Sequence, residues 1–427
     1  MKTAIINPKI QGLQPSATLA INERSHRLIS QGKDIFKLGL GQSPFPVPMP
    51  VQDALRRHAG EKDYLAVQGL ASLRTDIAAW HHERHGIAGD LTNIMIGPGS
   101  KELLFLLQLV HDSILTIPAP SWVSYEPQAQ IIGKRVEWLE TSPDSGWRLD
   151  PEVLENACAK DPNTRRLLIL NYPNNPTGLT YDSTQLQALA TVARKYGILV
   201  VSDEIYGEVN HRGNHVSMAQ FYPEGTIITS GLSKWCGAGG WRLGYCHIPS
   251  SLESIRAAMC AIASETFTSV SAPIQHAARA AFGHDPSIEI YLTNSRRILS
   301  SLGGWLAHTL RAENVRLDDP EGGFYVLPDF GGLSEALAHR GITTSPDLVE
   351  TILLETGVAF LPGTCFGRPA SELTARISYV DFDGDSALKS IEGTPANTEI
   401  GIDFLSQICG PTVEAINRLR DWCQKLS

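Results

Sequence analysis

The stretch RLLILNYPNNPTGLTYDSTQLQALATVARKYGILVVSDE, residues 166–204, decides the fold class. It opens with the continuously apolar run RLLIL, passes through a turn rich in proline and asparagine, and ends in a second apolar run, GILVV. Continuously apolar strands are typical of parallel sheets that are covered on both faces. Between the two runs, residues 183–197 have a helical pattern, with Ser183 as the expected N-cap and Gly197 just past the end. The stretch therefore predicts a strand–helix–strand unit with parallel strands.

The same alternation continues on both sides of this unit. Further strand candidates are 93–97, 113–118, 225–231 and 244–249, and helical patterns lie between several of them. Strands that alternate with helices predict an α/β protein with a doubly wound, mainly parallel sheet.

Both ends of the chain depart from this pattern. A helix is expected at 17–32, and the proline-rich stretch 41–50 must be extended because proline bars a regular helix. After residue 290 the chain shows a long helix (291–310), the hairpin-like segment GGFYVLPDF (322–330) and short strand patterns. These features predict a smaller α+β unit.

The two patterns suggest a division into domains. We expect a large α/β domain over residues 46–290 and a small α+β domain formed by residues 1–45 together with 291–427. The acidic stretch 381–411 has no predicted role.

The composition is that of an ordinary globular protein. Of its 427 residues, 36 are Lys or Arg and 45 are Asp or Glu, which gives a formal net charge of -9. No basic block stands out, so neither a nucleic acid nor a membrane surface is an expected partner. The N-terminus lacks the apolar run of a signal peptide, and no stretch is long enough to predict a membrane-spanning helix. The seven cysteines are scattered without a CxxC pair, which favours free thiols and a cytoplasmic location.

Polar residues follow several of the predicted strands, and ligands of open α/β sheets bind at the carboxyl ends of the strands. Gly99, Ser100 and Lys101 open a helix whose N-terminus could hold a phosphate, although an ordinary turn has the same composition. The segment NYPNNPTG (171–178) predicts a rigid polar turn, in which a cis bond at Asn175-Pro176 would fit.

The next two strand ends carry stronger signals. Asp203 ends a buried strand, where a carboxylate needs a cation such as a protonated ring nitrogen, and Tyr206 follows it; a helix N-cap and a packing tyrosine are the alternative. Lys234 lies among small residues in SGLSKWCGAGGWRLGY (230–245), where a lowered amine pKa would let it form a Schiff base. Arg242 can return a guanidinium to a phosphate. Pyridoxal 5'-phosphate requires this combination of groups.

On these residues the sequence resembles the class I/II aminotransferases, which are fold type I pyridoxal-phosphate enzymes, from about residue 10 to residue 380. The resemblance implies a sheet of the seven-stranded type. GLSKWCGAGGWRLG (231–244) is similar to the family's lysine signature, so Lys234 would bind the cofactor covalently and shuttle the proton, and Arg242 would bind its phosphate.

Other motifs extend the resemblance. NNPTG (174–178) and SDEIY (202–206) imply that Asn175 contacts the ring oxygen and the substrate carboxylate, Asp203 the ring nitrogen, and Tyr206 the ring oxygen. Trp122 would stack on the ring, and Gly99, Ser100 and Lys101 would lie at its phosphate end. Gly41 and Arg376 would bind the substrate carboxylate. Tyr64 would reach the cofactor phosphate of a neighbouring subunit. Tyr64 thus implies a homodimer.

Three features do not fit the family pattern or could mislead. Gly231 stands where many members have a hydroxyl group, so Ser233 or Ser230 is expected to replace it. GQSPF (41–45) alters the family's substrate-side loop. HHERH (81–85) lacks the spacing of a zinc-protease motif, so we expect a helix end before Gly86 and no metal.

The expected reaction is transamination. The segment QPSATLAINERSHRL (14–28) resembles the prokaryotic-type aspartate aminotransferase branch, in which Lys101 could meet a side-chain carboxylate; an ordinary lysine at a helix start is the alternative. Aspartate or glutamate is the expected amino donor, with 2-oxoglutarate as the acceptor. Aromatic or alanine transamination is the next alternative. A carbon–sulfur β-lyase would share every cofactor residue, whereas a pyridoxal-phosphate-sensing regulator would need a basic helix-turn-helix domain that the sequence does not show.

Overall fold

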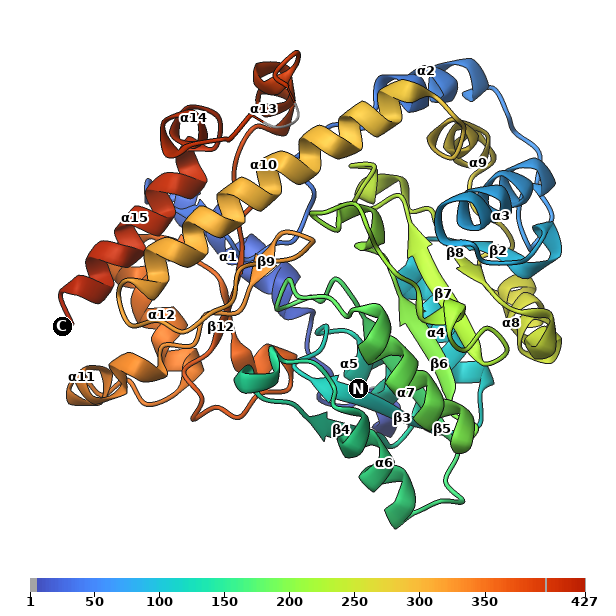
Figure 1. Ribbon diagram of the computed structural model, residues 1–427, viewed down its shortest axis with the longest axis horizontal. Helices are drawn as coiled ribbons and strands as arrows, with labels where there is room; N and C mark the ends of the chain where they lie inside the picture. The colour runs from blue at the N-terminus through green and yellow to red at the C-terminus, as the bar shows by residue number, and fades with distance from the viewer. Residues whose placement is uncertain (1–5, 396–397, 427) are drawn as a thin grey trace, which may run out of the picture.

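A seven-stranded sheet forms the centre of the α/β part of the protein (Figure 1). The computed structural model describes residues 6–395 and 398–426. The strands of this sheet are β2 (Ile94–Gly97), β3 (Ile114–Ala119), β4 (Val136–Glu140), β5 (Arg166–Asn171), β6 (Leu199–Asp203), β7 (Thr226–Gly231) and β8 (Gly244–His247). Their order is β2-β8-β7-β6-β5-β3-β4, and β8 runs antiparallel to β2 and β7 while the other paired strands are parallel. The predicted doubly wound, mainly parallel sheet is confirmed.

The sequence pattern did not predict β4. This strand lies at the edge of the sheet beside β3, and most of its residues are half-buried or exposed. Its sequence, VEWLE, contains two acidic residues and so does not form a continuous apolar run. Because an edge strand is only partly buried, its hydrophobic signal is weaker than that of the central strands.

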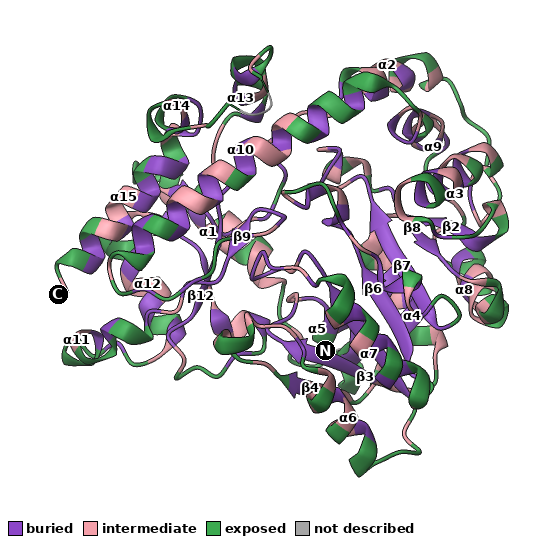
Figure 2. Cartoon of the chain, in the orientation of Figure 1, coloured by how far each residue is buried: buried purple, intermediate pink, exposed green. Residues whose placement is uncertain are grey.

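The α-helices cover the large sheet and also pack against the two small ones. They are α1 (Ala17–Ser30), α2 (Met49–His58), α3 (Ala71–His85), α4 (Ser100–Val110), α5 (Tyr125–Ile132), α6 (Pro151–Lys160), α7 (Ser183–Lys195), α8 (Glu253–Glu265), α9 (Ala272–Ala278), α10 (Pro286–Arg311), α11 (Ser334–His339), α12 (Ser345–Thr356), α13 (Gly384–Ile391), α14 (Ile402–Ile408) and α15 (Gly410–Gln424). The strands between them are largely buried (Figure 2).

Strand β5 shows why the central strands are apolar throughout. Leu167 and Ile169 belong to a core cluster with residues of α4 and α5. Leu168 and Leu170 belong to a different cluster with residues of α6 and α7. Successive side chains of a strand point to opposite faces, so both sets must be apolar when helices cover both faces.

The start of α7 lies one residue earlier than expected. Asp182, not Ser183, is the N-cap, and its carboxylate accepts a hydrogen bond from the backbone N–H of Gln185 at 2.8 Å while the Gln185 side chain accepts one from the Asp182 N–H. A carboxylate caps as well as a hydroxyl and also interacts favourably with the helix dipole. Gly197 lies just past the helix end with φ +61°, as predicted.

Two small sheets form the second part of the protein. Strands β9 (Tyr325–Val326), β11 (Leu361–Pro362) and β12 (Ala375–Ser378) make an antiparallel sheet in the order β11-β12-β9. The expectation of a hairpin in GGFYVLPDF was wrong, because β9 pairs with β12. Pro328 has no N–H to donate to a returning strand. Strand β1 (Phe36–Lys37) pairs in parallel with β10 (Val358–Ala359), so a segment from the N-terminal part of the chain lies beside one from its C-terminal part.

The stretch 381–411, which had no predicted role, includes α13 and α14. Both pack on α10, and the buried Ala387, Ile391, Leu405 and Ile408 extend the core there. The Arg297 guanidinium of α10 donates to the carbonyl groups of Thr394, Pro395 and Thr398 at 2.8–3.2 Å. These contacts hold the segment against the long helix.

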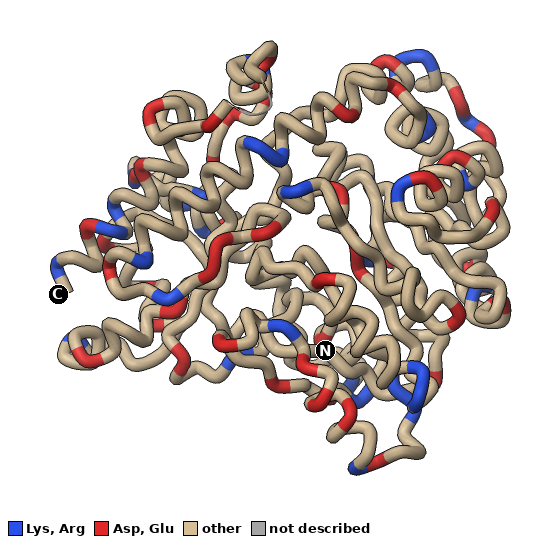
Figure 3. The backbone as a smooth tube through the Cα atoms, in the orientation of Figure 1, with Lys and Arg blue, Asp and Glu red and all other residues tan. Residues whose placement is uncertain are grey.

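Within the described residues, no helix is both long and apolar enough to span a membrane. Lys and Arg residues are interspersed with Asp and Glu along the drawn chain (Figure 3). The proposed domain boundaries near residues 46 and 290 remain a prediction.

Candidate active site

A cavity of about 480 Å³ brings together residues from the carboxyl ends of several strands and from the small antiparallel sheet. Of the residues singled out in the sequence, it is lined by Gly41, Ser100, Lys101, Trp122, Asn175, Asp203, Tyr206, Ser233, Lys234, Arg242 and Arg376. Parallel strands align their carboxyl ends at one edge of the sheet, which is why motifs far apart in the sequence meet here.

Lys234 follows β7 and directs its ammonium group into this cavity, where Nζ donates to the backbone carbonyl of Gly41 at 2.6 Å. Part of the side chain borders the open cavity, but Nζ itself lies deep in the protein. This burial, assisted by the positive charge of Arg376, lowers the pKa of Lys234 to about 7. A substantial fraction of the amine is therefore neutral and nucleophilic near neutral pH.

Asp203 ends β6 with its carboxylate at the buried edge of the cavity. It accepts hydrogen bonds from the Tyr125 hydroxyl at 2.6 Å and the Thr229 hydroxyl at 3.2 Å. Burial raises the pKa of Asp203 to about 6, although these hydrogen bonds act in the opposite direction. Its hydrogen-bond donors within the described chain are neutral, so the site suits a ligand that brings its own positive charge, such as a protonated ring nitrogen.

The N-terminus of α4 and Arg242 form a potential phosphate cradle. Arg242 has a left-handed backbone, φ +54°, and its guanidinium donates to the carbonyls of Gly239 at 2.9 Å and Pro98 at 3.3 Å. A Cβ atom on Gly99 would collide with this guanidinium, and one on Gly244 would collide with the backbone N of Ser100. Gly244 thus allows β8 to approach the start of α4, whose free N–H groups attract anions, and Gly99 leaves space for the Arg242 guanidinium beside it.

Arg376, on β12, supplies a second cationic site. It is 1% exposed, lies between the rings of Tyr325 and Phe366, and donates to Asn175 Oδ1 at 3.2 Å and to the Gly39 carbonyl. Burial lowers the pKa of its guanidinium, and Nε has no hydrogen-bond partner among the described residues. A planar carboxylate from the cavity could occupy the remaining donors.

Several residues near the site were not predicted. Tyr125 and Tyr325 contact Asp203 and Tyr206, and Asn171 Oδ1 accepts a hydrogen bond from the backbone of Asn175 at 2.8 Å. Tyr125 lies three residues after Trp122, and Tyr325 lies in GGFYVLPDF. Neither had a signal that distinguished it from a packing tyrosine.

The two serines near Gly231 lie in different surroundings. Ser233 lines the cavity, whereas the Ser230 hydroxyl is directed at the Glu204 carbonyl, 3.4 Å away. A Cβ atom on Gly231 would lie 2.7 Å from the Leu243 carbonyl oxygen, which leaves no room for a side chain at that position. Glycine at 231 follows from this close strand contact.

Three further expectations concern Tyr64, the Asn175-Pro176 bond and the HHERH segment. Tyr64 is 89% exposed and lies outside the cavity of its own chain. The expected cis bond at Asn175-Pro176 is not found; cis bonds occur instead at Ala119-Pro120 and Tyr172-Pro173. The prediction that HHERH ends a helix is confirmed, because α3 stops at His85 and Gly86 has φ +64°.

One group of possible metal ligands lies elsewhere in the described chain. His58, Glu61 and His276 bring their ligand atoms within 4.8 Å of one another on α2, the following turn and α9. His58 already contacts Glu61 at 3.3 Å, and all three side chains are at least partly exposed. An ordinary surface contact accounts for this grouping.

The donor set fits pyridoxal phosphate. A neutral lysine amine, a buried carboxylate without a cation, an indole ring from Trp122 and an anion cradle are the groups that this cofactor needs. The sequence profile of the aminotransferase class I and II family matches residues 33–383. The chain belongs to this family.

Individual relatives agree with the assignment of this aminotransferase. The chain is 32% identical to the aspartate aminotransferase of Geobacillus stearothermophilus over 381 residues, which cover 87% of this chain and 93% of that protein. It is also 32% identical to the aspartate/prephenate aminotransferase of Thermus thermophilus, over 88% of this chain and 94% of that protein. The solved structure of Thermus thermophilus aspartate aminotransferase with maleate superimposes with a TM-score of 0.83 at 28% identity, covering 98% of this chain and all of that one. The protein is a pyridoxal-phosphate-dependent aminotransferase with the fold type I architecture.

Proposed function

We propose that this aminotransferase takes L-aspartate or L-glutamate as amino donor and a 2-oxo acid such as 2-oxoglutarate as acceptor. The observation that carries this proposal is the presence of two cations from separate elements, Lys101 of α4 and Arg376 of β12, in one cavity. A dicarboxylic substrate would place its α-carboxylate on Arg376 and its distal carboxylate on Lys101. The names of the aspartate aminotransferases among the relatives support the same choice.

We assign the cofactor contacts as follows. Asp203 holds the ring nitrogen, Tyr206 and Asn175 the ring oxygen, and Trp122 the face of the ring. The phosphate is held by Arg242, Ser233 and the backbone N–H groups of Gly99, Ser100 and Lys101 at the start of α4, and the Lys101 ammonium group is left for the distal carboxylate of the substrate. Gly41 and Asn175 border the substrate carboxylate beside Arg376. Bound pyridoxal phosphate supplies an electron sink for the bonds at the substrate α-carbon.

Lys234 has two tasks in the proposed reaction. Its neutral amine holds the cofactor covalently until an amino acid takes its place. The released Nζ then takes the proton from the substrate α-carbon and delivers it to a carbon of the cofactor. A pKa near 7 suits this exchange, because an amine that titrates near the working pH can both accept and donate the proton.

The substrate proposal is tested with a half-reaction that needs no acceptor. Purified holoenzyme is mixed with L-aspartate, L-glutamate, L-alanine or L-phenylalanine, and the visible absorbance of the cofactor is followed. The acidic donors should react fastest. Lys101→Gln should lower the second-order rate constant of the half-reaction with aspartate by about 100-fold, and that with alanine by less than about threefold. Lys62→Gln, at an exposed lysine with 84% of its side-chain surface accessible, is the control.

Other outcomes would favour the alternatives. Equal losses for aspartate and alanine would place Lys101 at the cofactor and not at the substrate. Faster reaction with phenylalanine or alanine would favour the aromatic or alanine aminotransferase, and release of pyruvate and a thiol from a thioether amino acid would favour a β-lyase.

We further propose a homodimer in which Tyr64 reaches the cofactor phosphate of the neighbouring subunit. Tyr64 is 89% exposed within one chain, so its side chain is accessible to a neighbouring subunit. A cytoplasmic location is proposed on the seven free thiols, which suit a reducing compartment.

A further inference from the structure

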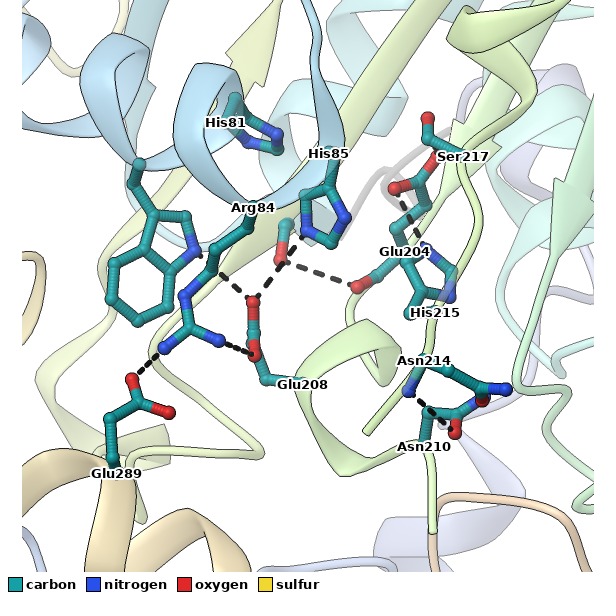
Figure 4. Close-up of polar contacts among 12 residues, drawn as sticks. His81, Arg84, His85, Glu204, Glu208, Asn210, Asn214, His215, Ser217 and Glu289 are labelled. Carbon is teal, nitrogen blue, oxygen red and sulfur yellow. Dashed lines mark hydrogen bonds and ion pairs between the residues drawn. The ribbon is translucent and has the colours of Figure 1, made fainter. Parts of the chain in front are cut away.

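The segment 203–209 has two chemically different sides. Asp203 and Tyr206 line the cavity, whereas Glu204 and Glu208 are directed away from it, toward α3, α10 and the loop 210–217 (Figure 4). The motif HHERH, which the catalytic site does not use, supplies part of this rear surface. Charged groups therefore contact the segment 203–209 on the side opposite the cavity.

Glu204 is held by three side chains. Its Oε1 accepts hydrogen bonds from the Ser202 hydroxyl at 2.7 Å and the Ser217 hydroxyl at 2.6 Å, and its Oε2 lies 2.9 Å from His215 Nε2. The side chains of Glu204 and His215 are each only 3% exposed. Both carboxylate oxygens are thus fixed, immediately next to Asp203 in the chain.

Glu208 is held by a second set of donors. The indole N–H of Trp80 donates to Oε1 at 3.1 Å, and Oε2 accepts from Arg84 at 3.3 Å and Arg296 at 3.1 Å. Arg296 also donates from Nε to the backbone carbonyl of Glu208 at 2.8 Å, and His85 Nε2 lies 3.7 Å from Oε1. Residues of α3 and α10 therefore meet at one carboxylate, two residues after Tyr206.

These carboxylates remain charged despite their burial. Burial alone would raise the pKa of both carboxylates. The pKa of Glu204 is instead lowered to about 2 by His215 and Ser217. The pKa of Glu208 is lowered to about 2 by His85, Arg84 and Arg296. Buried ion pairs seldom stabilise a fold more than well-packed apolar groups, while a fully bonded charge fixes geometry in a way that apolar contacts do not. Such a network is better explained by orientation than by stability.

We propose that Glu204 and Glu208 are positioning residues for Asp203 and Tyr206. On the side opposite the cavity, each glutamate fixes the backbone that carries these two side chains toward the cofactor. Glu204 fixes the end of β6 at Asp203. Glu208 fixes the turn after Tyr206 to α3 and α10. The inference rests on the proposed cofactor contacts of Asp203 and Tyr206.

The test compares Glu204→Gln and Glu208→Gln with the wild type and with two reference variants. Glu137→Gln removes another partly buried ion pair, with Arg166, at the β4–β5 side of the sheet, and reports the effect of general destabilisation. Asp203→Asn reports whether Asp203 itself senses the cofactor. Three properties are measured: the dissociation constant for the binding of pyridoxal phosphate to the cofactor-free protein, the pH midpoint of the visible band of the holoenzyme, and the steady-state kinetics, which give kcat and KM separately.

We expect Glu204→Gln to move the pH midpoint by at least about 0.5 pH unit and Glu208→Gln to weaken cofactor binding by about tenfold. In both variants kcat should fall by about tenfold with KM within about threefold of the wild type, because orientation at the reacting ring is lost and substrate contacts remain. Glu137→Gln should lower only the melting temperature.

The inference fails if the Glu204 and Glu208 variants match Glu137→Gln in all three properties while Asp203→Asn changes them. If Asp203→Asn also leaves the midpoint and the cofactor affinity unchanged, the proposed contact of Asp203 fails first. Should either glutamine variant not fold, Ser217→Ala and Trp80→Phe each remove one neutral donor from Glu204 or Glu208, and they should change the same quantities in the same direction by smaller amounts.

Discussion

The hydroxyl oxygens of Tyr206 and Tyr325 lie 2.8 Å apart and join the end of β6 in the large sheet to β9 in the small one. The ring of Tyr325 also covers the Arg376 guanidinium at 4.8 Å, and a Cβ atom on Gly41 would collide with its hydroxyl. Burial raises the pKa of both phenols, so each remains protonated and can donate one hydrogen bond. The pair thus links the proposed ring-oxygen contact to the proposed carboxylate site.

Tyr325→Phe should lower kcat/KM for aspartate by about tenfold without unfolding the protein, because Tyr206 loses the partner that orients its hydroxyl. Steady-state kinetics and a thermal melt measure the two effects. Tyr181→Phe is the matched control, since the Tyr181 hydroxyl accepts a hydrogen bond from the Leu149 backbone away from the cavity lining. A larger loss in the control than in Tyr325→Phe would contradict the prediction.

Lys234 should be modified selectively by an aldehyde near neutral pH. Cofactor-free protein is incubated with pyridoxal phosphate, reduced with borohydride and mapped by mass spectrometry. Labelling of Lys234 should rise with pH to half its maximum near pH 7, because its pKa is about 7. Lys195, whose pKa is raised by its hydrogen bond to Glu155, should remain unlabelled under the same conditions. Labelling of both lysines with the same pH dependence would contradict the lowered pKa.

Asp203→Asn should stabilise the cofactor-free protein at pH 8. The folded-state pKa of Asp203, about 6, lies above the ordinary value of 3.8, so the folded state binds more protons between these values and loses stability as the pH rises through them. The destabilisation at pH 8 is on the order of 3 kcal/mol, and Asn would remove it.

Thermal melts of cofactor-free wild type and Asp203→Asn at pH 5 and pH 8 measure this effect. The advantage of the variant should be larger at pH 8, and added pyridoxal phosphate should stabilise the wild type more than the variant. Asp144→Asn, at an exposed ion pair with Arg316, should show no such pH dependence. A constant difference between wild type and Asp203→Asn at both pH values would contradict the prediction.

Mixed dimers test the proposed position of Tyr64. Tyr64→Ala and Lys234→Ala should each be impaired alone, and dissociating and reassociating them together should restore activity, because one site per mixed dimer then has both native residues. With half of the dimers mixed and one of two sites intact, about a quarter of wild-type activity is expected. No recovery would mean that Tyr64 acts in its own subunit or not at all.

The residues that determine the β-α-β pattern are local, which is why the fold class could be predicted from the sequence. Leu167 to Leu170 are apolar on both faces of β5, and the helical pattern of α7 follows directly. By contrast, β4 was missed because most of its residues are only partly buried, which weakens its hydrophobic pattern. The apparent hairpin at Tyr325 was wrong because its strand partner lies about 50 residues away in the sequence.

The sequence by itself determined that the sheet is mainly parallel and that Asp203 and Lys234 come at or after the carboxyl ends of its strands, because parallel strands bring their carboxyl ends to one edge whatever the detailed packing. Only the tertiary structure decided which groups surround them. The contact of Tyr125 with Asp203 spans 78 residues, and that of Trp80 with Glu208 spans 128. Such contacts depend on how whole helices and strands pack, and no local periodicity encodes them.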